Sequence, residues 1–217
     1  MGAAGIAKNP MNNFLFDCKI CECGCDGKSK GVYDFENDAA LSEKYENMLI
    51  AEINQRSTIE AKKCSVRNYP DIELLNKGQV VAYLEVKFQQ RTFMKVKERL
   101  PEADLVPSET LALNQSDLMR YFALYEKDPK PMFIVWGLKN RPCIVPQGKV
   151  KFYYQHIGEL RRIYNEYRDK RRFRRASGNG DVIDGVHKGV VVNWHFSLAE
   201  LSLFTIDEFL KANGNFQ

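Results

Sequence analysis

The segment from residue 69 to residue 88 constrains the fold more than any other part of the chain, because it has the pattern of two β-strands joined by a tight turn. The even positions on both sides of the turn are all apolar: Ile72, Leu74, Val80, Ala82, Leu84, Val86 and Phe88. Successive side chains of a strand point to opposite faces, so these residues share one face and predict the buried side of a sheet. A shift by one residue would expose this apolar set, so the register is strongly specified.

The turn predicts how the two strands pair. Residues 76 to 78 read Asn-Lys-Gly and fit a three-residue hairpin loop, whose last residue adopts a left-handed conformation that glycine tolerates. Leu75 would then pair with Gln79. Continuing this register places Asp71 opposite Tyr83.

Charged side chains gather on the other face of the predicted hairpin, which carries Asp71, Glu73, Glu85 and Lys87. Asp71 and Glu85 would be diagonal neighbours with Cβ atoms about 7 Å apart, and a divalent metal fits between carboxylates at that separation. Two carboxylates on stiff strands suit Mg²⁺, which keeps waters and substrate phosphate as its remaining ligands. Such an ion lowers the pKa of its water and neutralises charge developing on phosphorus. Lys87 points the same way and can hold the attacking water or a nonbridging oxygen.

This arrangement resembles the PD-(D/E)xK signature of the restriction-endonuclease-like superfamily, which includes restriction enzymes, Holliday-junction resolvases and recombination nucleases. The resemblance is carried by Pro70-Asp71 and Glu85-Val86-Lys87. It implies an α/β fold whose mixed central β-sheet is flanked by helices. It also implies metal binding by Asp71, Glu85 and the backbone carbonyl of Val86, with Lys87 as the catalytic lysine.

The family pattern further places an acidic residue on the helix before the hairpin, and often a glutamine shortly after the lysine. Helical spacing over residues 38 to 56 puts Glu46 on the flank of an apolar stripe and Glu52 near its centre. A carboxylate that faces a core is costly unless it is paired or binds metal. Glu52 therefore competes with Glu46, which the family spacing favours as a metal ligand. Gln89 matches the glutamine, and we expect it to support water or phosphate.

A thiol cluster near the N-terminus leaves two main interpretations open. Residues 1 to 31 are expected to form a tail, and residues 32 to 217 a nuclease domain with a basic C-terminal elaboration. The tail contains Cys18, Cys21, Cys23 and Cys25. A typical zinc site pairs two C-x-x-C steps at a distance, whereas this cluster has one. The four thiols are candidate ligands of a structural Zn²⁺; the alternatives are reduced surface thiols in a reducing cytoplasm, and a disulfide.

Positive charge is concentrated in one segment of a chain whose net formal charge is only +4. From residue 161 to residue 175, eight basic residues stand against two acidic ones. We expect a basic helix over residues 155 to 175 that faces DNA phosphates. The residues expected at the phosphates are Arg171, Arg172, Arg174 and Arg175. The alternative is a solvated helix face.

The remaining pattern predicts a few more elements. Residues 114 to 127 have the spacing of an amphipathic helix, and residues 132 to 136 that of a buried strand, beside which residues 143 to 145 could pair. Residues 189 to 194 predict a last strand. A capping box at Thr205 predicts a short C-terminal helix. No apolar run is long enough to cross a membrane, and no secretory signal is expected.

These observations predict a cytoplasmic, Mg²⁺-dependent DNA endonuclease of the restriction type, in which Mn²⁺ can replace Mg²⁺. Two alternatives stay open: a Holliday-junction resolvase or recombination nuclease, and an inactive DNA-binding protein with the nuclease fold. Because two strands must be cut, or a symmetric junction resolved, a homodimer is also expected.

Overall fold

A computed structural model describes residues 35 to 213, apart from residues 91, 94, 140, 142, 147, 175 to 181, 184, 185 and 188 to 191. The helices are α1 (Phe35–Arg56), α2 (Val96–Arg99), α3 (Gln115–Lys127), α4 (Ile157–Tyr167) and α5 (Ile206–Ala212), with 3₁₀ turns η1 (Pro107–Glu109), η2 (Arg168–Arg171) and η4 (Leu198–Glu200). The strands are β1 (Glu60–Lys63), β2 (Ile72–Asn76), β3 (Gln79–Gln89), β4 (Thr110–Asn114), β5 (Met132–Leu138), β6 (Lys151–His156), β7 (Arg172–Arg174), β8 (Val182–Ile183), β9 (Val186–His187), β10 (Val192–Ser197) and β11 (Ser202–Leu203). The chain is a mixed α/β protein.

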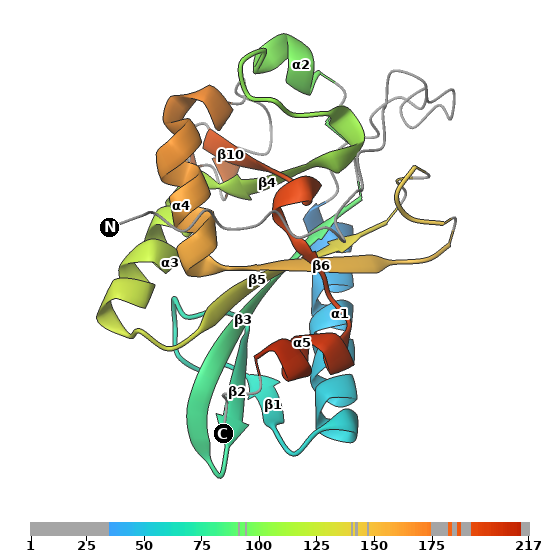
Figure 1. Ribbon diagram of the computed structural model, residues 1–217, viewed down its shortest axis with the longest axis vertical. Coiled ribbons are helices and arrows are strands. Elements are labelled where there is room, and N and C mark those ends of the chain that lie inside the picture. Colours follow the sequence, from blue (N-terminus) through green and yellow to red (C-terminus); the bar gives the residue numbers. More distant parts are fainter. Residues whose placement is uncertain are drawn as a thin grey trace, which may run out of the picture.

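A six-stranded sheet with the order β1-β2-β3-β5-β6-β11 forms the centre of the molecule (Figure 1). Strands β3 and β5 are parallel, whereas the other neighbours in this sheet are antiparallel. A parallel pair needs a crossover connection, and here the crossover contains α2, β4 and α3. A second sheet has the order β4-β10-β7. The predicted mixed central sheet is confirmed.

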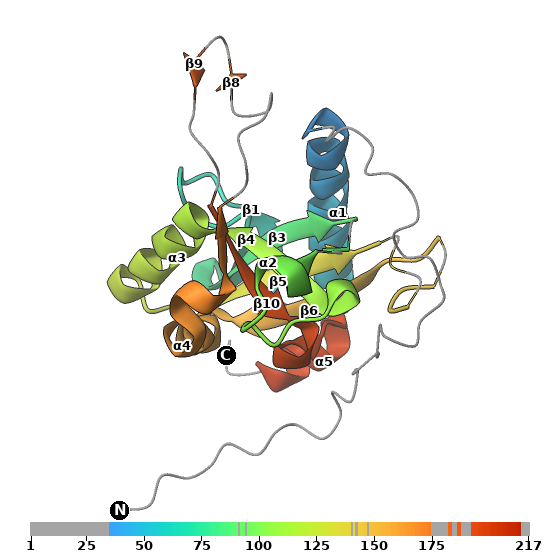
Figure 2. The same cartoon turned by 90° about the horizontal axis from the view of Figure 1, so that it is seen from above.

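Helices cover both faces of the central sheet, as Figure 2 shows from above. One apolar cluster joins α1 and α5 to the sheet and includes Leu49, Ile53, Ile72, Leu74, Ala82, Leu84, Val86 and Phe209. Another joins α3, α4 and the second sheet to the opposite face and includes Tyr83, Leu118, Tyr121, Trp136, Leu160 and Trp194. The even positions of the hairpin pack mainly against α1, as their alternation predicts. The other face of the sheet is also covered, so its charged residues lie between layers.

The turn of the hairpin is shorter than predicted. Asn76 pairs with Gln79, which leaves a two-residue loop. Both loop residues have positive φ, 50° at Lys77 and 78° at Gly78. Such a pair of left-handed residues matches the twist of the flanking strands and favours a tight two-residue hairpin. Lys77 thus adopts the left-handed conformation that the sequence pattern predicted only for Gly78.

An irregularity between Leu74 and Leu75 shifts the strand register a second time. Glu73, rather than Asp71, therefore lies opposite Tyr83. A bulge of this kind adds a residue to one strand and bends it. The predicted register was wrong by two positions, and because two is the period of a strand, Asp71 keeps its predicted face and moves toward Glu85.

The C-terminal half departs further from the predictions. The expected basic helix over residues 155 to 175 is wrong: α4 ends at Tyr167, because Arg168 has a φ of 42° that interrupts the helix. The chain then continues through η2 into β7. Strand β6, rather than residues 143 to 145, pairs with β5. The last long strand begins at Val192, whereas α3 and α5 form where they were expected. In the described part of the chain, no helix is both long and apolar enough to span a membrane.

Candidate active site

The predicted charged residues of the hairpin lie together where β2 begins. Asp71 directly precedes β2, and its Oδ2 accepts a hydrogen bond of 2.8 Å from the backbone N–H of Val86. The carboxyl groups of Asp71 and Glu85 lie close enough to affect each other's pKa. The Nζ of Lys87 forms an ion pair with Glu85. The register described above thus brings the two carboxyl groups close together.

Burial dominates the electrostatics of this group. Glu85 is only 2% exposed, and burial raises the pKa of its carboxyl group more than Lys87 lowers it. Burial also raises the pKa of Asp71. For Lys87, burial is the largest single effect and lowers the pKa of the ammonium group, but the carboxylates of Glu85, Asp71 and Asp117 together outweigh it and raise that pKa. Lys87 therefore stays charged. Its single positive charge does not balance the two carboxyl groups of Asp71 and Glu85.

Helix α1 adds a third carboxyl group to the same region. Glu46 lies within electrostatic range of both Asp71 and Glu85, and its Oε2 is 3.6 Å from Nζ of Lys63 on β1. Burial raises the pKa of Glu46, in part against the effect of Lys63. Of the two helix carboxylates that the sequence left open, Glu46 is therefore the one near the hairpin pair.

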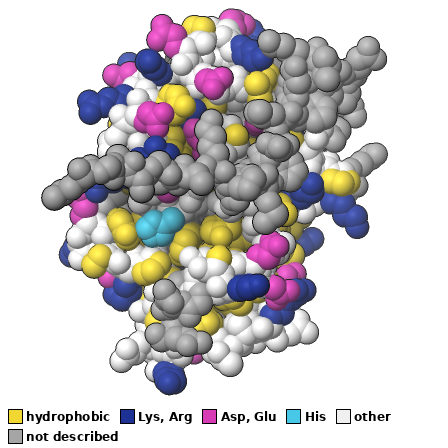
Figure 3. All heavy atoms as spheres, in the orientation of Figure 1, with side chains coloured by type: hydrophobic (Ala, Val, Ile, Leu, Met, Phe, Trp, Pro, Cys, Tyr) yellow, Lys and Arg dark blue, Asp and Glu magenta, His cyan; other side chains and the backbone are white. Residues whose placement is uncertain are grey.

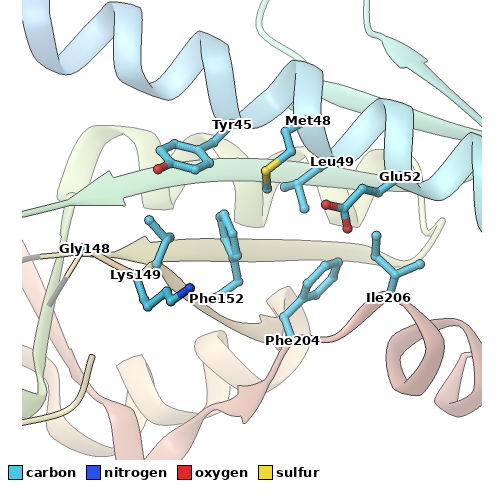
Figure 4. Close-up of a pocket in the computed structure, with 10 residues that line it drawn as sticks. Tyr45, Met48, Leu49, Glu52, Gly148, Lys149, Phe152, Phe204 and Ile206 are labelled. Atoms are coloured by element: carbon cyan, nitrogen blue, oxygen red, sulfur yellow. The ribbon is translucent and has the colours of Figure 1, made fainter. Parts of the chain in front are cut away.

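Glu52 belongs to a different surface of α1. It lines a pocket that is otherwise formed largely by apolar side chains, among them Met48, Phe152, Phe204 and Ile206. In Figure 4 its carboxylate extends from α1 toward Phe204 and Ile206. Glu52 can lie on the apolar stripe of α1 because its side chain lines a pocket and is not enclosed in the core.

The paired carboxyl groups fit a hard divalent cation. Within the described residues, no three His, Cys, Asp or Glu side chains form a group that could hold a metal ion. Mg²⁺ does not need such a cage, because it binds through one or two carboxylates and keeps water and phosphate ligands. A cation between Asp71 and Glu85 would remove the mutual repulsion of the two carboxylates, which raises the pKa of Glu85.

Gln89 is bonded to the neighbouring sheet. Its Nε2 donates to the carbonyl of Ala112 over 2.6 Å, and its Oε1 accepts from the N–H of Ala112 over 3.3 Å. Buried Arg141 lies 3.5 Å from the same Oε1. The amide thus ties the end of β3 to β4, and a role toward water or phosphate would require breaking these bonds.

The predicted DNA-contacting arginines separate into two kinds. Arg171 is 1% exposed, its Nη1 lies 2.6 Å and 2.7 Å from the two carboxylate oxygens of Glu200, and its guanidinium stacks on Tyr167. It is a core residue here and not the surface cation that the sequence predicts. Arg172 and Arg174 are exposed on β7. Arg175 and the four predicted cysteine ligands lie outside the described residues.

Two residues of α3 reach the site although sequence reasoning assigned them no role there. The hydroxyl group of Tyr121 interacts with the Glu85 carboxylate and lowers its pKa, and Nη2 of Arg120 donates to the Tyr121 oxygen over 2.8 Å. One signal was present in the sequence. Tyr121 lies on the apolar face of its helix, where a buried hydroxyl group needs a hydrogen-bond partner.

Charges of both signs are interspersed on the outer surface. On the face seen in Figure 3, Lys and Arg side chains alternate with Asp and Glu side chains. Several of the expected cations are neutralised in this way, since Arg161 pairs with Glu126 and Arg162 with Glu159 and Glu166. The basic segment therefore presents less free positive charge than its composition predicts.

Comparisons with solved structures give a distant likeness. No protein-family model matches the chain, and no curated protein sequence matches it. Among solved structures it is similar to Hjc, a Holliday junction resolvase from the archaeal hyperthermophile Archaeoglobus fulgidus, at 12% sequence identity and a TM-score of 0.42, over 79% of this chain and 96% of that chain.

Proposed function

We propose that this protein is a metal-dependent nuclease that hydrolyses phosphodiester bonds in DNA. One observation carries the proposal: the hairpin places Asp71 and Glu85 beside each other and next to Lys87, and Glu46 of α1 lies within electrostatic range of both carboxyl groups. Burying three carboxyl groups is costly unless they bind a cation or are otherwise paired. Lys87 and Lys63 each pair with one of these carboxyl groups, and a divalent cation would balance the charge that remains at Asp71 and Glu85.

In the proposed site, Asp71, Glu85 and the carbonyl of Val86 hold Mg²⁺ or Mn²⁺, with Glu46 as the helix carboxylate beside them. When bound, the cation supplies an acidified water and stabilises negative charge on phosphorus. Lys87 holds the attacking water or a nonbridging oxygen through its ammonium group, which Glu85 orients. Glu46 is itself held by Lys63, which limits its motion relative to the hairpin.

Two forms of DNA are candidate substrates, plain duplex and branched DNA. The sequence favours a restriction-type endonuclease, with a junction resolvase or recombination nuclease as the alternative. A homodimer would suit either substrate, because each presents two strands to be cut. The site residues do not select between these substrates, so both forms of DNA are included in the test.

The proposed activity predicts cleavage that depends on a divalent metal. Incubation with supercoiled plasmid and Mg²⁺ should produce nicked or linear DNA, and EDTA should abolish cutting because the carboxylates alone cannot activate water. A parallel reaction with a synthetic four-way junction and a linear duplex of the same sequence measures the preference for branched DNA. If none of these substrates is cut with Mg²⁺ or Mn²⁺, the proposed function is wrong.

Arg172 and Arg174 should contribute to DNA affinity through phosphate contacts. Each such contact adds about −0.9 to the slope of log affinity against log salt on duplex DNA. Replacing both residues with glutamine should therefore flatten the slope by at most about two units, and equally on any sequence. Titrations over a range of salt concentrations measure this. The double variant Arg161→Gln/Arg162→Gln is the control, because both arginines already have carboxylate partners. A slope unchanged by the β7 substitutions would show that this strand faces solvent.

A further inference from the structure

A chain of polar contacts runs from the surface of α3 to the buried carboxylate of β3. Tyr121 is 1% exposed, and its hydroxyl group lies close enough to the Glu85 carboxylate to lower the pKa of Glu85 as a hydrogen-bond donor would. The oxygen of that hydroxyl accepts a hydrogen bond of 2.8 Å from Nη2 of Arg120. A hydroxyl that accepts from a cation becomes a stronger donor to the next group, because linked hydrogen bonds polarise one another. Arg120 thus strengthens the hold of Tyr121 on Glu85.

Arg120 is held through one guanidinium nitrogen, Nη2, while part of its side chain remains exposed. Its Nη2 is 3.1 Å from Oδ1 of Asp117, one helical turn earlier, and its side chain is 41% exposed. Its guanidinium carbon lies 4.8 Å from the centre of the Tyr121 ring. In the described part of the chain, the structure gives its Nε and Nη1 no partner. The exposed guanidinium lies within electrostatic range of Glu85, at the edge of the proposed metal site.

We propose that Arg120 is a phosphate-contacting residue of this site and that Tyr121 is the positioning residue that fixes the Glu85 carboxylate. This inference rests on the proposed nuclease function. Under this proposal, the substrate phosphate contacts two cationic side chains, Lys87 on β3 and Arg120 on α3.

The two cations differ in what they can do. Lys87 is bound to Glu85, so part of its charge is used within the site. A guanidinium offers several N–H donors in a fixed plane that match two phosphate oxygens at once. Arg120 can therefore keep its contact with Tyr121 through Nη2 and present its other donors to the DNA backbone.

The test uses two variants, each with a matched control. Tyr121→Phe removes only the hydroxyl group that contacts Glu85, and Tyr83→Phe is its control, because the buried Tyr83 hydroxyl bonds to the remote Asp128 over 3.2 Å. Arg120→Gln removes the guanidinium. Arg161→Gln is its control, because Arg161 is 42% exposed, pairs with one carboxylate and lies near an aromatic ring. Mn²⁺ affinity is measured by calorimetry, and single-turnover cleavage and DNA affinity are measured at saturating Mn²⁺.

The two variants should fail in different ways. Tyr121→Phe should weaken Mn²⁺ binding by about 10- to 100-fold, the usual effect of removing a group that orients a metal ligand, and leave DNA affinity unchanged. Arg120→Gln should change Mn²⁺ affinity much less and reduce cleavage at saturating metal by about 100-fold. Arg120→Lys should recover part of that loss, since it restores the charge without the planar donors. Both controls should stay within about two-fold of the parent protein.

The inference is overturned if Tyr121→Phe binds Mn²⁺ as the parent does, or if Arg120→Gln cleaves as fast as Arg161→Gln. Either result together with an inactive Asp71→Asn variant leaves the proposed nuclease function intact. A parent protein that binds Mn²⁺ but cuts no DNA overturns the nuclease function and the phosphate role of Arg120, while the calorimetry still decides the role of Tyr121. A parent protein that binds no Mn²⁺ overturns both assignments.

Discussion

Asp71→Asn should reduce DNA cleavage by at least about a thousand-fold, because metal activation supplies several kcal/mol of transition-state stabilisation and each 1.36 kcal/mol is about a factor of ten. The asparagine oxygen can still accept the hydrogen bond from the Val86 N–H, so the hairpin should keep its register. Glu85→Gln should have a similar effect. Single-turnover rates measure the loss, and calorimetry should show that both variants lose Mn²⁺ affinity. We use Glu73→Gln as the control, since Glu73 lies on the same hairpin but pairs with Lys62 at 3.1 Å.

Lys87→Met separates metal binding from chemistry in the same experiment. Because the proposed partner of Lys87 is water or phosphate, this variant should lose about 100- to 1000-fold in rate, the usual effect of removing one stabilising donor, yet still bind Mn²⁺. If Lys87→Met lost metal affinity as completely as Asp71→Asn, the role of the lysine would be wrong. Nuclease activity that survived Asp71→Asn at the parent level would remove the whole site assignment.

Arg171→Gln should lower the free energy of unfolding by about 3 to 5 kcal/mol, the usual cost of breaking a buried ion pair from one side. The Arg171 side chain is 2% exposed and that of Glu200 17% exposed, so water cannot readily replace the lost partner. Glu200 also accepts the N–H of Ser197 over 2.9 Å, and this cap of η4 should loosen at the same time. Thermal unfolding followed by circular dichroism should show a decrease in Tm on the order of 10 °C.

Arg162→Gln is the matched surface variant for this measurement. Arg162 contacts two carboxylates, but its side chain is 55% exposed, and exposed ion pairs contribute less than about 1 kcal/mol. If the two variants unfolded at the same temperature, Arg171 would not support the fold, and its role as a DNA-binding cation would have to be considered again.

The hairpin was the most predictable part of the molecule. Its alternation is a local property, so the sequence indicates which residues share a face regardless of what packs on them. The face of Asp71 and Glu85 was therefore correct even though the register was not. Two local details escaped the pattern: Lys77 adopts a left-handed conformation, and the strand is irregular at Leu74 and Leu75. Their effects add up to a shift of two residues, which preserves the face.

Residues whose environment depends on distant segments could not be predicted in the same way. A run of basic residues has the composition of a DNA-binding helix, but Arg171 is buried because Glu200 comes close to it from a segment 29 residues away in sequence. The choice between Glu46 and Glu52 likewise depended on what packs beside α1, where β1 supplies Lys63 and the C-terminal region supplies Phe204. The contact of Tyr121 with Glu85 needed the crossover to place α3 over the sheet.

The same topology has a consequence for the order in which the site assembles. Asp71 and Glu85 belong to one hairpin, whereas Tyr121 lies on the crossover that leads to the parallel partner strand β5. Closing a longer loop costs more entropy, so local strand pairs tend to form before parallel pairs. During folding, the two carboxylates can therefore meet while they are still hydrated, and Glu85 loses its water only when α3 docks. The charge is therefore buried late in the folding reaction. A cost that arises after the transition state mainly speeds unfolding and has less effect on the folding rate.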